Sequence, residues 1–317
     1  MIAPGETKGK QADITLKSIL RLNRMHKALV FHTNSQALRM FPRISFTIPG
    51  FKHIKNHTIH VLTLPGLKRS GPTVVLIHGL AATASSWMPL IKELSRRAAK
   101  FIIFDLPGHG LSPAVEPPFT FLDAYEIVKA VILRELEPDD KPIIVGNSLG
   151  GAFAMRFVLD YPKLVSRAIL ISPAGAPFPT SAKDVIAPFF VTTHQEAIDI
   201  LHKIFVRPSL SSDILAPQLL MTARHPCFLT LLTSILQYDT DPESPVRKMI
   251  LTKEELRQCP VPIQLIWGQK DKVLPQGMRD FYDAYLPDNC TRIFPETFGH
   301  CPQFEDTKAL ASLMNLD

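Results

Sequence analysis

The sequence predicts an α/β fold with a mostly parallel central sheet, helices on both of its faces and an inserted helical segment. From about residue 54, short and continuously apolar segments alternate with amphipathic ones. The alternation stops between residues 176 and 258, where the chain is rich in proline and helix-like, and then resumes. Strands of a parallel sheet are buried on both faces and therefore appear as unbroken apolar runs.

The alternating segments can be assigned in chain order. Apolar, β-branched runs predict strands, and segments with apolar residues at helical spacing predict helices. Ser85 or Ser86 is the expected N-cap of the first helix of the core. The expected strands are 73–79, 100–105, 142–148, 166–171, 262–268 and 291–295, and the expected helices are 85–99, 121–137, 149–162, 275–286 and one from about residue 303.

This pattern divides the chain into three parts. Residues 1–43 form a basic N-terminal helical arm, residues 44–175 together with 259–317 form the α/β core, and residues 176–258 form a helical cap. In an open parallel sheet, functional residues are expected at the carboxyl ends of the strands. The cap is inserted after one of those ends, so we expect it to lie over the functional residues.

The net charge of +6 is confined to the N-terminal arm. Residues 1–43 carry eight lysines and arginines against two acidic residues, and the rest of the chain is neutral. Leu16, Ile19, Leu22 and Met25 follow helical spacing between basic residues, so the arm could lie peripherally on an anionic membrane or pack on the core. No nucleic-acid motif accompanies the charge, so no nucleic-acid partner is expected. The oligomeric state is left open.

The N-terminus and the cysteines indicate a cytoplasmic, possibly membrane-associated protein. The start, "MIAPGETKGK", has no apolar leader segment. The four cysteines lack metal-ligand spacing, and free thiols are expected in a reducing compartment. A Cys290–Cys301 disulfide is left open. No metal and no cofactor are expected.

Ser148 stands between a predicted strand and a predicted helix, in the pattern Gly146-x-Ser148-x-Gly150. In that context the pattern is typical of a nucleophile elbow, in which a sharp turn exposes the serine. The two glycines remove side chains that would meet the neighbouring strand and helix, and Gly151 permits still closer packing. The other interpretation is that Ser148 only caps the helix.

Two further residues support the interpretation of Ser148 as a nucleophile. A serine hydroxyl needs a base, and the base needs a third group to orient it. Asp271 follows strand 262–268, and His300 follows strand 291–295, so both lie in loops at carboxyl ends. Taken singly, Asp271 could be a loop residue that caps the following helix, and His300 could be a surface histidine. The loop after strand 166–171, "SPAGA", offers no carboxylate in place of Asp271.

The remaining requirement is a pair of donors for an oxyanion. The turn at His78 and Gly79 would present the backbone N–H of Leu80, and the N–H of Leu149 follows the nucleophile directly. His78 and His109 are expected to have structural roles.

These motifs resemble those of the α/β-hydrolase superfamily. The resemblance covers roughly residues 44–317 and rests on "LIHGLAATASSW", "FDLPGHGLS", "GNSLGG", "WGQKDKVLP" and "FGHCPQFE", in that order. Within it the chain is most similar to capped esterases, lipases and meta-cleavage-product hydrolases. The resemblance implies Ser148 as nucleophile, Asp271 as acid and His300 as base. The glycine-rich loop and the tryptophan after the histidine, usual in carbon–carbon hydrolases of this group, are absent.

The sequence therefore predicts a serine hydrolase that cleaves small apolar carboxylic esters through an acyl-enzyme, with Leu80 and Leu149 as oxyanion donors. Apolar runs in the cap favour an apolar substrate. Two other interpretations stay open, namely a carbon–carbon bond hydrolase of the meta-cleavage-product type and a non-catalytic small-molecule-binding protein on the same fold.

Overall fold

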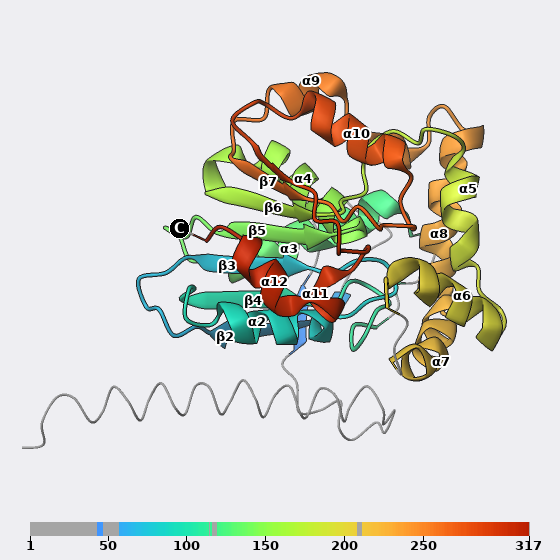
Figure 1. Cartoon of the computed structure of the whole chain (residues 1–317), viewed down its shortest axis with the longest axis horizontal. Helices are drawn as coiled ribbons and strands as arrows, with labels where there is room; N and C mark the ends of the chain where they lie inside the picture. The colour runs from blue at the N-terminus through green and yellow to red at the C-terminus, as the bar shows by residue number, and fades with distance from the viewer. Residues whose placement is uncertain (1–42, 47–56, 114, 116–118, 208–210, 317) are drawn as a thin grey trace, which may run out of the picture.

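The computed structural model (Figure 1) describes most of the predicted core and cap. The basic arm predicted at residues 1–43 lies outside the described residues, apart from Arg43. The structure describes residues 43–46, 57–113, 115, 119–207 and 211–316.

Within these residues, eight strands form one sheet in the order β1-β2-β4-β3-β5-β6-β7-β8. Strand β2 runs antiparallel to both of its neighbours, β1 and β4, and all the other pairs are parallel. The predicted mostly parallel sheet is confirmed. The strands are β1 (Arg43–Phe46), β2 (His57–Pro65), β3 (Thr73–Ile77), β4 (Lys100–Phe104), β5 (Ile143–Asn147), β6 (Arg167–Ile171), β7 (Ile263–Ile266) and β8 (Thr291–Ile293).

Strand β3 shows why the central strands are continuously apolar. Val75 and Ile77 belong to the hydrophobic cluster on one face of the sheet, and Val74 and Leu76 belong to the cluster on the other. All four are fully buried. Successive side chains of a strand point to opposite faces, so a strand covered on both sides needs an apolar residue at every position.

Helices cover both faces of the sheet (Figure 1). Helices α3 (Phe121–Glu135), α4 (Leu149–Asp160) and α10 (Gln276–Tyr285) contribute to one hydrophobic cluster. Helices α2 (Met88–Leu94) and α12 (Thr307–Leu313) contribute to the other, and the short helix α11 (Pro302–Glu305) precedes α12. The core is thus two apolar layers separated by the sheet.

The sequence predicted that the first helix of the core covers residues 85–99 and is capped by a serine. The observed helix is shorter and has no serine cap. Residues Ala84–Trp87 form a 3₁₀ turn, α2 begins only at Met88, and neither Ser85 nor Ser86 is its N-cap. The N–H of Ala84, at the start of this turn, donates to Asp105 Oδ1 at 2.7 Å. A carboxylate from the end of β4 therefore satisfies the start of the segment, which a local serine was expected to do.

The chain between β6 and β7 is mainly helical within its described residues. Figure 1 shows α5 to α8 beyond the carboxyl ends of the strands, while α9 lies beside α10. The Leu251 N–H donates to the Gly175 carbonyl at 2.8 Å, so a hydrogen bond joins the start and the end of this helical segment. The elements are α5 (Ala182–Ile186), η4 (Ala187–Phe189), α6 (His194–Ile204), α7 (Ser211–Ala223), α8 (Pro226–Thr240), η5 (Pro245–Met249) and α9 (Lys253–Arg257).

A helix that spans a membrane must be about 20 residues long and mostly apolar. Among the described residues, no single helix is long and apolar enough to cross a bilayer. Helices α7 and α8 reach the required length and apolarity only when taken together, across a bend of 70°.

A buried carboxylate, Asp105, ties the antiparallel edge of the sheet to the loop after β4. Asp105 Oδ2 lies 2.7 Å from His60 Nδ1 of β2 and accepts the Leu111 N–H at 3.0 Å. Burial by itself raises the pKa of Asp105, but hydrogen bonding to His60, the charges of His60 and His78, and the Ala84 N–H outweigh burial and bring the pKa to about 2. Asp105 is therefore a buried anion with several partners.

Replacing Asp105 by asparagine tests this network. Asp105 is a buried anion that is hydrogen-bonded to His60 and to two backbone N–H groups. Breaking such a buried network costs about 3 kcal/mol or more, so D105N should lower the free energy of unfolding by that amount at pH 7. The folded pKa of about 2 lies below the ordinary aspartate value of 3.8, so the contribution to stability is present above about pH 4 and is lost as the pH falls toward 2. Urea unfolding of wild type and variant from pH 7 to pH 3 measures both effects.

The control is D140N, because Asp140 pairs with Lys100 while partly exposed. A partly exposed pair contributes at most about 1 kcal/mol. Equal losses of stability in D105N and D140N would contradict the special role of Asp105.

Candidate active site

Ser148 occupies a strained turn between β5 and α4. Its backbone angles are φ +55° and ψ −120°, a conformation that residues with side chains rarely adopt and that costs about 1–3 kcal/mol. Ser148 stands at the N-cap position of α4, but its side chain makes no capping hydrogen bond. The side chain of Ser148 therefore does not cap α4, and the strain indicates another use of this side chain.

The surrounding glycines allow the turn to pack. A Cβ on Gly146 would lie 2.2 Å from the Gly150 carbonyl oxygen, and a Cβ on Gly150 would lie 2.1 Å from the carbonyl oxygen of Ile77. A Cβ on Gly151 would lie 2.7 Å from Pro173 Cβ. All three distances are shorter than any real contact. The turn can therefore form only if these positions carry no side chain.

Asp271 and His300 form a buried pair. Asp271 follows β7, and its Oδ2 lies 2.8 Å from His300 Nδ1. Its other oxygen accepts the N–H groups of Val273 and Leu274 at 2.8 and 3.1 Å. Burial by itself raises the pKa of Asp271, but the charge of His300 and these hydrogen bonds hold it below its usual value. The carboxylate is thus charged and oriented toward the imidazole.

Taken singly, Asp271 could have been a loop cap and His300 a surface residue. The structure shows instead that the two side chains are buried and face each other. The side chains of both residues are almost completely buried, with 2% and 4% exposed. Asp271 does accept two backbone N–H groups of its own loop, but its second oxygen faces His300. The two residues predicted from the sequence order as acid and base therefore lie together as a hydrogen-bonded pair.

The backbone of His300 lies against Asn147, the residue that precedes Ser148. The side chain of Asn147 donates to the carbonyl oxygen of His300 at 3.0 Å. No hydrogen bond is present between the hydroxyl of Ser148 and the imidazole of His300, both of which are described. Hydrogen bonds between catalytic groups are often long before substrate binds. The residue before Ser148 therefore contacts the backbone of His300, while the Ser148 hydroxyl makes no hydrogen bond to the Asp271–His300 pair.

Leu80 and Leu149, the predicted oxyanion donors, line the same cavity as Ser148. No acceptor among the described residues binds the N–H of either residue. Leu149 is the first residue of α4, where the helix dipole favours negative charge. Both amides are thus available to a ligand at Ser148.

His78 supports the turn that carries Leu80. It is fully buried, its Nε2 accepts the Leu106 N–H at 2.9 Å, and its Nδ1 lies 2.8 Å from the Gly79 carbonyl oxygen. Burial lowers the pKa of His78 and brings the pKa of His109 to about 3. Both histidines are buried and hydrogen-bonded within the fold, as expected for structural residues.

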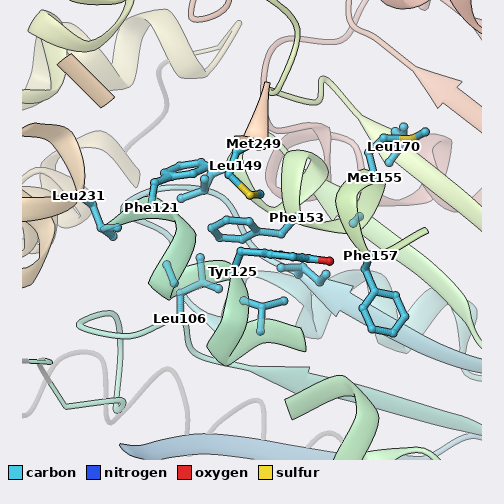
Figure 2. Close-up of a cluster of buried hydrophobic side chains, with 14 of the residues drawn as sticks. Leu106, Phe121, Tyr125, Leu149, Phe153, Met155, Phe157, Leu170, Leu231 and Met249 are labelled. Atoms are coloured by element: carbon cyan, nitrogen blue, oxygen red, sulfur yellow. The ribbon is translucent and has the colours of Figure 1, made fainter. Parts of the chain in front are cut away.

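An apolar cavity of about 70 Å³ lies over Ser148. Among the described residues that line it, Ser148 alone has a polar side chain. Figure 2 shows three of the lining residues, Phe121, Leu149 and Met249, close to Phe153 of the same buried cluster. The core contributes Leu80, Phe121, Leu149, Ala174, Gly175, Val273, Leu274 and Met278 to the lining, and the helical segment contributes Phe178, Val185, Ile186, Phe189, Ile235, Val246, Met249 and Ile250.

The cysteines do not form the disulfide that the sequence left open. Cys227, Cys259, Cys290 and Cys301 are all free and buried. Burial, followed by the nearby charges of Asp271 and Glu305, raises the pKa of the Cys301 thiol, so Cys301 is not a competing nucleophile. Among the described residues, no cluster of histidine, cysteine, aspartate or glutamate side chains is arranged to bind a metal.

Comparison with known proteins gives the same architecture. A family model described as the alpha/beta hydrolase fold matches residues 72–200. The solved structure of a 2-hydroxy-6-oxo-6-phenylhexa-2,4-dienoate hydrolase from Rhodococcus superposes with a TM-score of 0.69 at 20% identity, over 86% of this chain and 97% of that one. The chain has the alpha/beta hydrolase fold. This identification agrees with the resemblance noted in the motifs around Ser148, Asp271 and His300.

The curated relatives of the chain include an esterase and a dienoate hydrolase. The pimeloyl-(acyl-carrier protein) methyl ester esterase of Nitrosomonas europaea is 27% identical over 247 residues, which cover 74% of this chain and 90% of the esterase. A 2-hydroxy-6-oxo-6-phenylhexa-2,4-dienoate hydrolase of Burkholderia cepacia is 26% identical over 265 residues, which cover 77% of this chain and 86% of the relative.

Substitution of Gly150 tests whether the turn at Ser148 depends on close packing. In G150A the added Cβ meets a backbone oxygen that cannot move without breaking the sheet, so we expect a loss of roughly 3 kcal/mol or more in the free energy of unfolding. G277A is the matched control, because its added Cβ meets a proline side chain at 2.9 Å instead. Thermal unfolding compares the two, and a G150A protein as stable as wild type would contradict the packing argument.

Proposed function

We propose that the protein hydrolyses small apolar carboxylic esters through an acyl-enzyme formed on Ser148. One observation carries the proposal. Among the described residues that line an apolar cavity, the only polar side chain is a serine held at a strained turn, and the residue before it is hydrogen-bonded to His300 of a buried Asp271–His300 pair. An apolar cavity accepts the ester, and Ser148 is the one side chain among these lining residues that can attack a carbonyl.

In the proposed reaction, His300 acts as the general base and Asp271 orients it. Asp271 Oδ2 holds His300 Nδ1, which leaves Nε2 to take the proton of Ser148 as its oxygen attacks the ester carbonyl. The charge of Asp271 stabilises the imidazolium that forms. His300 then protonates the leaving alcohol. Water, activated by His300 in turn, attacks the acyl-enzyme and releases the acid.

The N–H groups of Leu80 and Leu149 would stabilise the oxyanion of both tetrahedral intermediates. Both amides lie at the cavity and have no acceptor among the described residues. Backbone donors that are already oriented need no reorganisation when the charge develops, which is why such sites lower the barrier strongly.

The lining favours a neutral ester over the carbon–carbon bond substrates named for some relatives. Those names specify dienoates, which carry a carboxylate. No lysine, arginine or histidine is among the described residues of the cavity wall. An unpaired carboxylate in an apolar cavity is strongly unfavourable. The absence of the tryptophan after the histidine, where Cys301 stands, points the same way.

A non-catalytic binding protein is the remaining candidate from another class. A binding protein would gain nothing from the unfavourable backbone conformation at Ser148, because that conformation costs stability. The proposal of catalysis accounts for this conformation and gives the buried Asp271–His300 pair a role.

Replacement of Ser148 by alanine tests the nucleophile. With p-nitrophenyl butyrate as substrate, S148A should lose activity by roughly a thousandfold or more, because the covalent route is removed. A fluorophosphonate probe should label wild type at Ser148 and leave S148A unlabelled, as mass spectrometry of the peptide would show. Substantial activity in S148A would exclude Ser148 as nucleophile, and an unlabelled, inactive wild type would favour a binding protein.

A pair of substrates tests the apolar cavity. The kcat/KM for p-nitrophenyl butyrate should exceed that for p-nitrophenyl hemisuccinate by roughly tenfold or more, since the second compound places a carboxylate in the cavity. Spontaneous alkaline hydrolysis of the two esters corrects for their intrinsic reactivity. Equal kcat/KM values, or faster cleavage of a 2-hydroxy-6-oxo-dienoate than of either ester, would favour the carbon–carbon hydrolase instead.

A further inference from the structure

Asn147, at the end of β5, is a buried amide that has four hydrogen-bond partners. It is 1% exposed and directly precedes Ser148. Its Nδ2 donates to the carbonyl oxygens of Ile171 and His300, both at 3.0 Å. Its Oδ1 accepts from Gln303 Nε2 at 3.0 Å and lies 3.3 Å from the thiol of Cys301. The side chain therefore connects the nucleophile turn to the end of β6 and to the loop of His300.

The partners determine which way the amide points. Backbone carbonyl oxygens can only accept hydrogen bonds, so the atom that faces Ile171 and His300 must be the NH₂ group. A carboxylate at this position would place an oxygen against two carbonyl oxygens. Asparagine satisfies this site because it combines two donors on one side with an acceptor on the other.

Asn147 supplies the second of two hydrogen bonds that hold the backbone of His300 in place. The N–H of His300 donates to the carbonyl oxygen of Ile204, at the end of α6, at 3.1 Å. The carbonyl oxygen of His300 accepts from Asn147, and its imidazole is held by Asp271. Three elements distant in sequence thus restrain one residue, and Asn147 provides the only one of these restraints that is covalently adjacent to Ser148.

We propose that Asn147 is a positioning residue that fixes the distance between Ser148 and the base His300. The inference rests on the proposed function, because it assumes that His300 acts on Ser148. Asn147 does not line the cavity, so it acts through His300 and does not contact the substrate. A displacement of a catalytic group by about 1 Å can lower the rate by about a hundredfold. Loss of the Asn147 donor therefore lowers kcat and leaves KM nearly unchanged.

The test compares N147D and N147A with wild type in p-nitrophenyl butyrate hydrolysis. N147D keeps the shape and the acceptor oxygen but lacks the donor, and N147A lacks both. Titration with a fluorophosphonate counts the sites that can still react, so kcat is expressed per competent site and any misfolded fraction is removed. We expect kcat per site to fall by roughly tenfold to a hundredfold in both variants, with KM within about twofold of wild type.

The control is Q264M, which removes another buried amide of similar exposure, bonded to Leu313 and Asn315 near the C-terminus. It should lower the melting temperature without changing kcat per site. The inference is wrong if N147D and N147A keep kcat per site within about twofold of wild type, or if Q264M loses as much as they do. A wild-type protein with no Ser148-dependent esterase activity would instead overturn the proposed function itself.

Discussion

The strained turn at Ser148 is the constraint on which the rest of the site depends. A serine at φ +55° is held there only because β5 and α4 are packed against each other and against the end of β3. That packing requires glycine at positions 146, 150 and 151, where any Cβ would meet backbone or ring atoms at 2.1 to 2.7 Å. The packing of the sheet therefore keeps Ser148 in an unfavourable backbone conformation, and the stability of the two hydrophobic layers offsets the cost. The hydroxyl is presented to the cavity as a consequence of this packing.

Two buried polar side chains hold the loops that surround this turn. Asp105 binds the N–H groups of Ala84 and Leu111 and so organises the loops after β3 and β4, one of which carries Leu80. Asn147 holds the loop after β8, which carries His300. Buried polar groups must be hydrogen-bonded, so each loop has one conformation that satisfies the buried side chain. Loops at the carboxyl ends of strands thereby acquire the rigidity that a catalytic site needs.

The helical segment between β6 and β7 has a different role from the core. The core supplies Ser148, the Asp271–His300 pair and both candidate oxyanion donors, while the helical segment supplies about half of the cavity wall. It also contacts His300 through the hydrogen bond between the Ile204 carbonyl and the His300 N–H. In the proposed function, the core would determine the reaction and the helical segment would determine which acyl group fits. The contact at Ile204 would make the position of the base sensitive to how that segment packs.

The sequence by itself determined the features that depend on short-range rules. The parallel strands follow from continuous apolar runs, the turn at Ser148 from its glycines, and the positions of Asp271 and His300 from their place after β7 and β8. Only the tertiary structure decided the antiparallel strand β2, the His60–Asp105 pair, the shortened helix α2 and the partners of Asn147. These depend on contacts between residues far apart in the chain, such as Asn147 and Gln303, which are separated by 156 positions. Periodicity and steric exclusion act within a few residues and can be recognised in a sequence, whereas the partner of a buried polar side chain is set by which loops the folded sheet brings together.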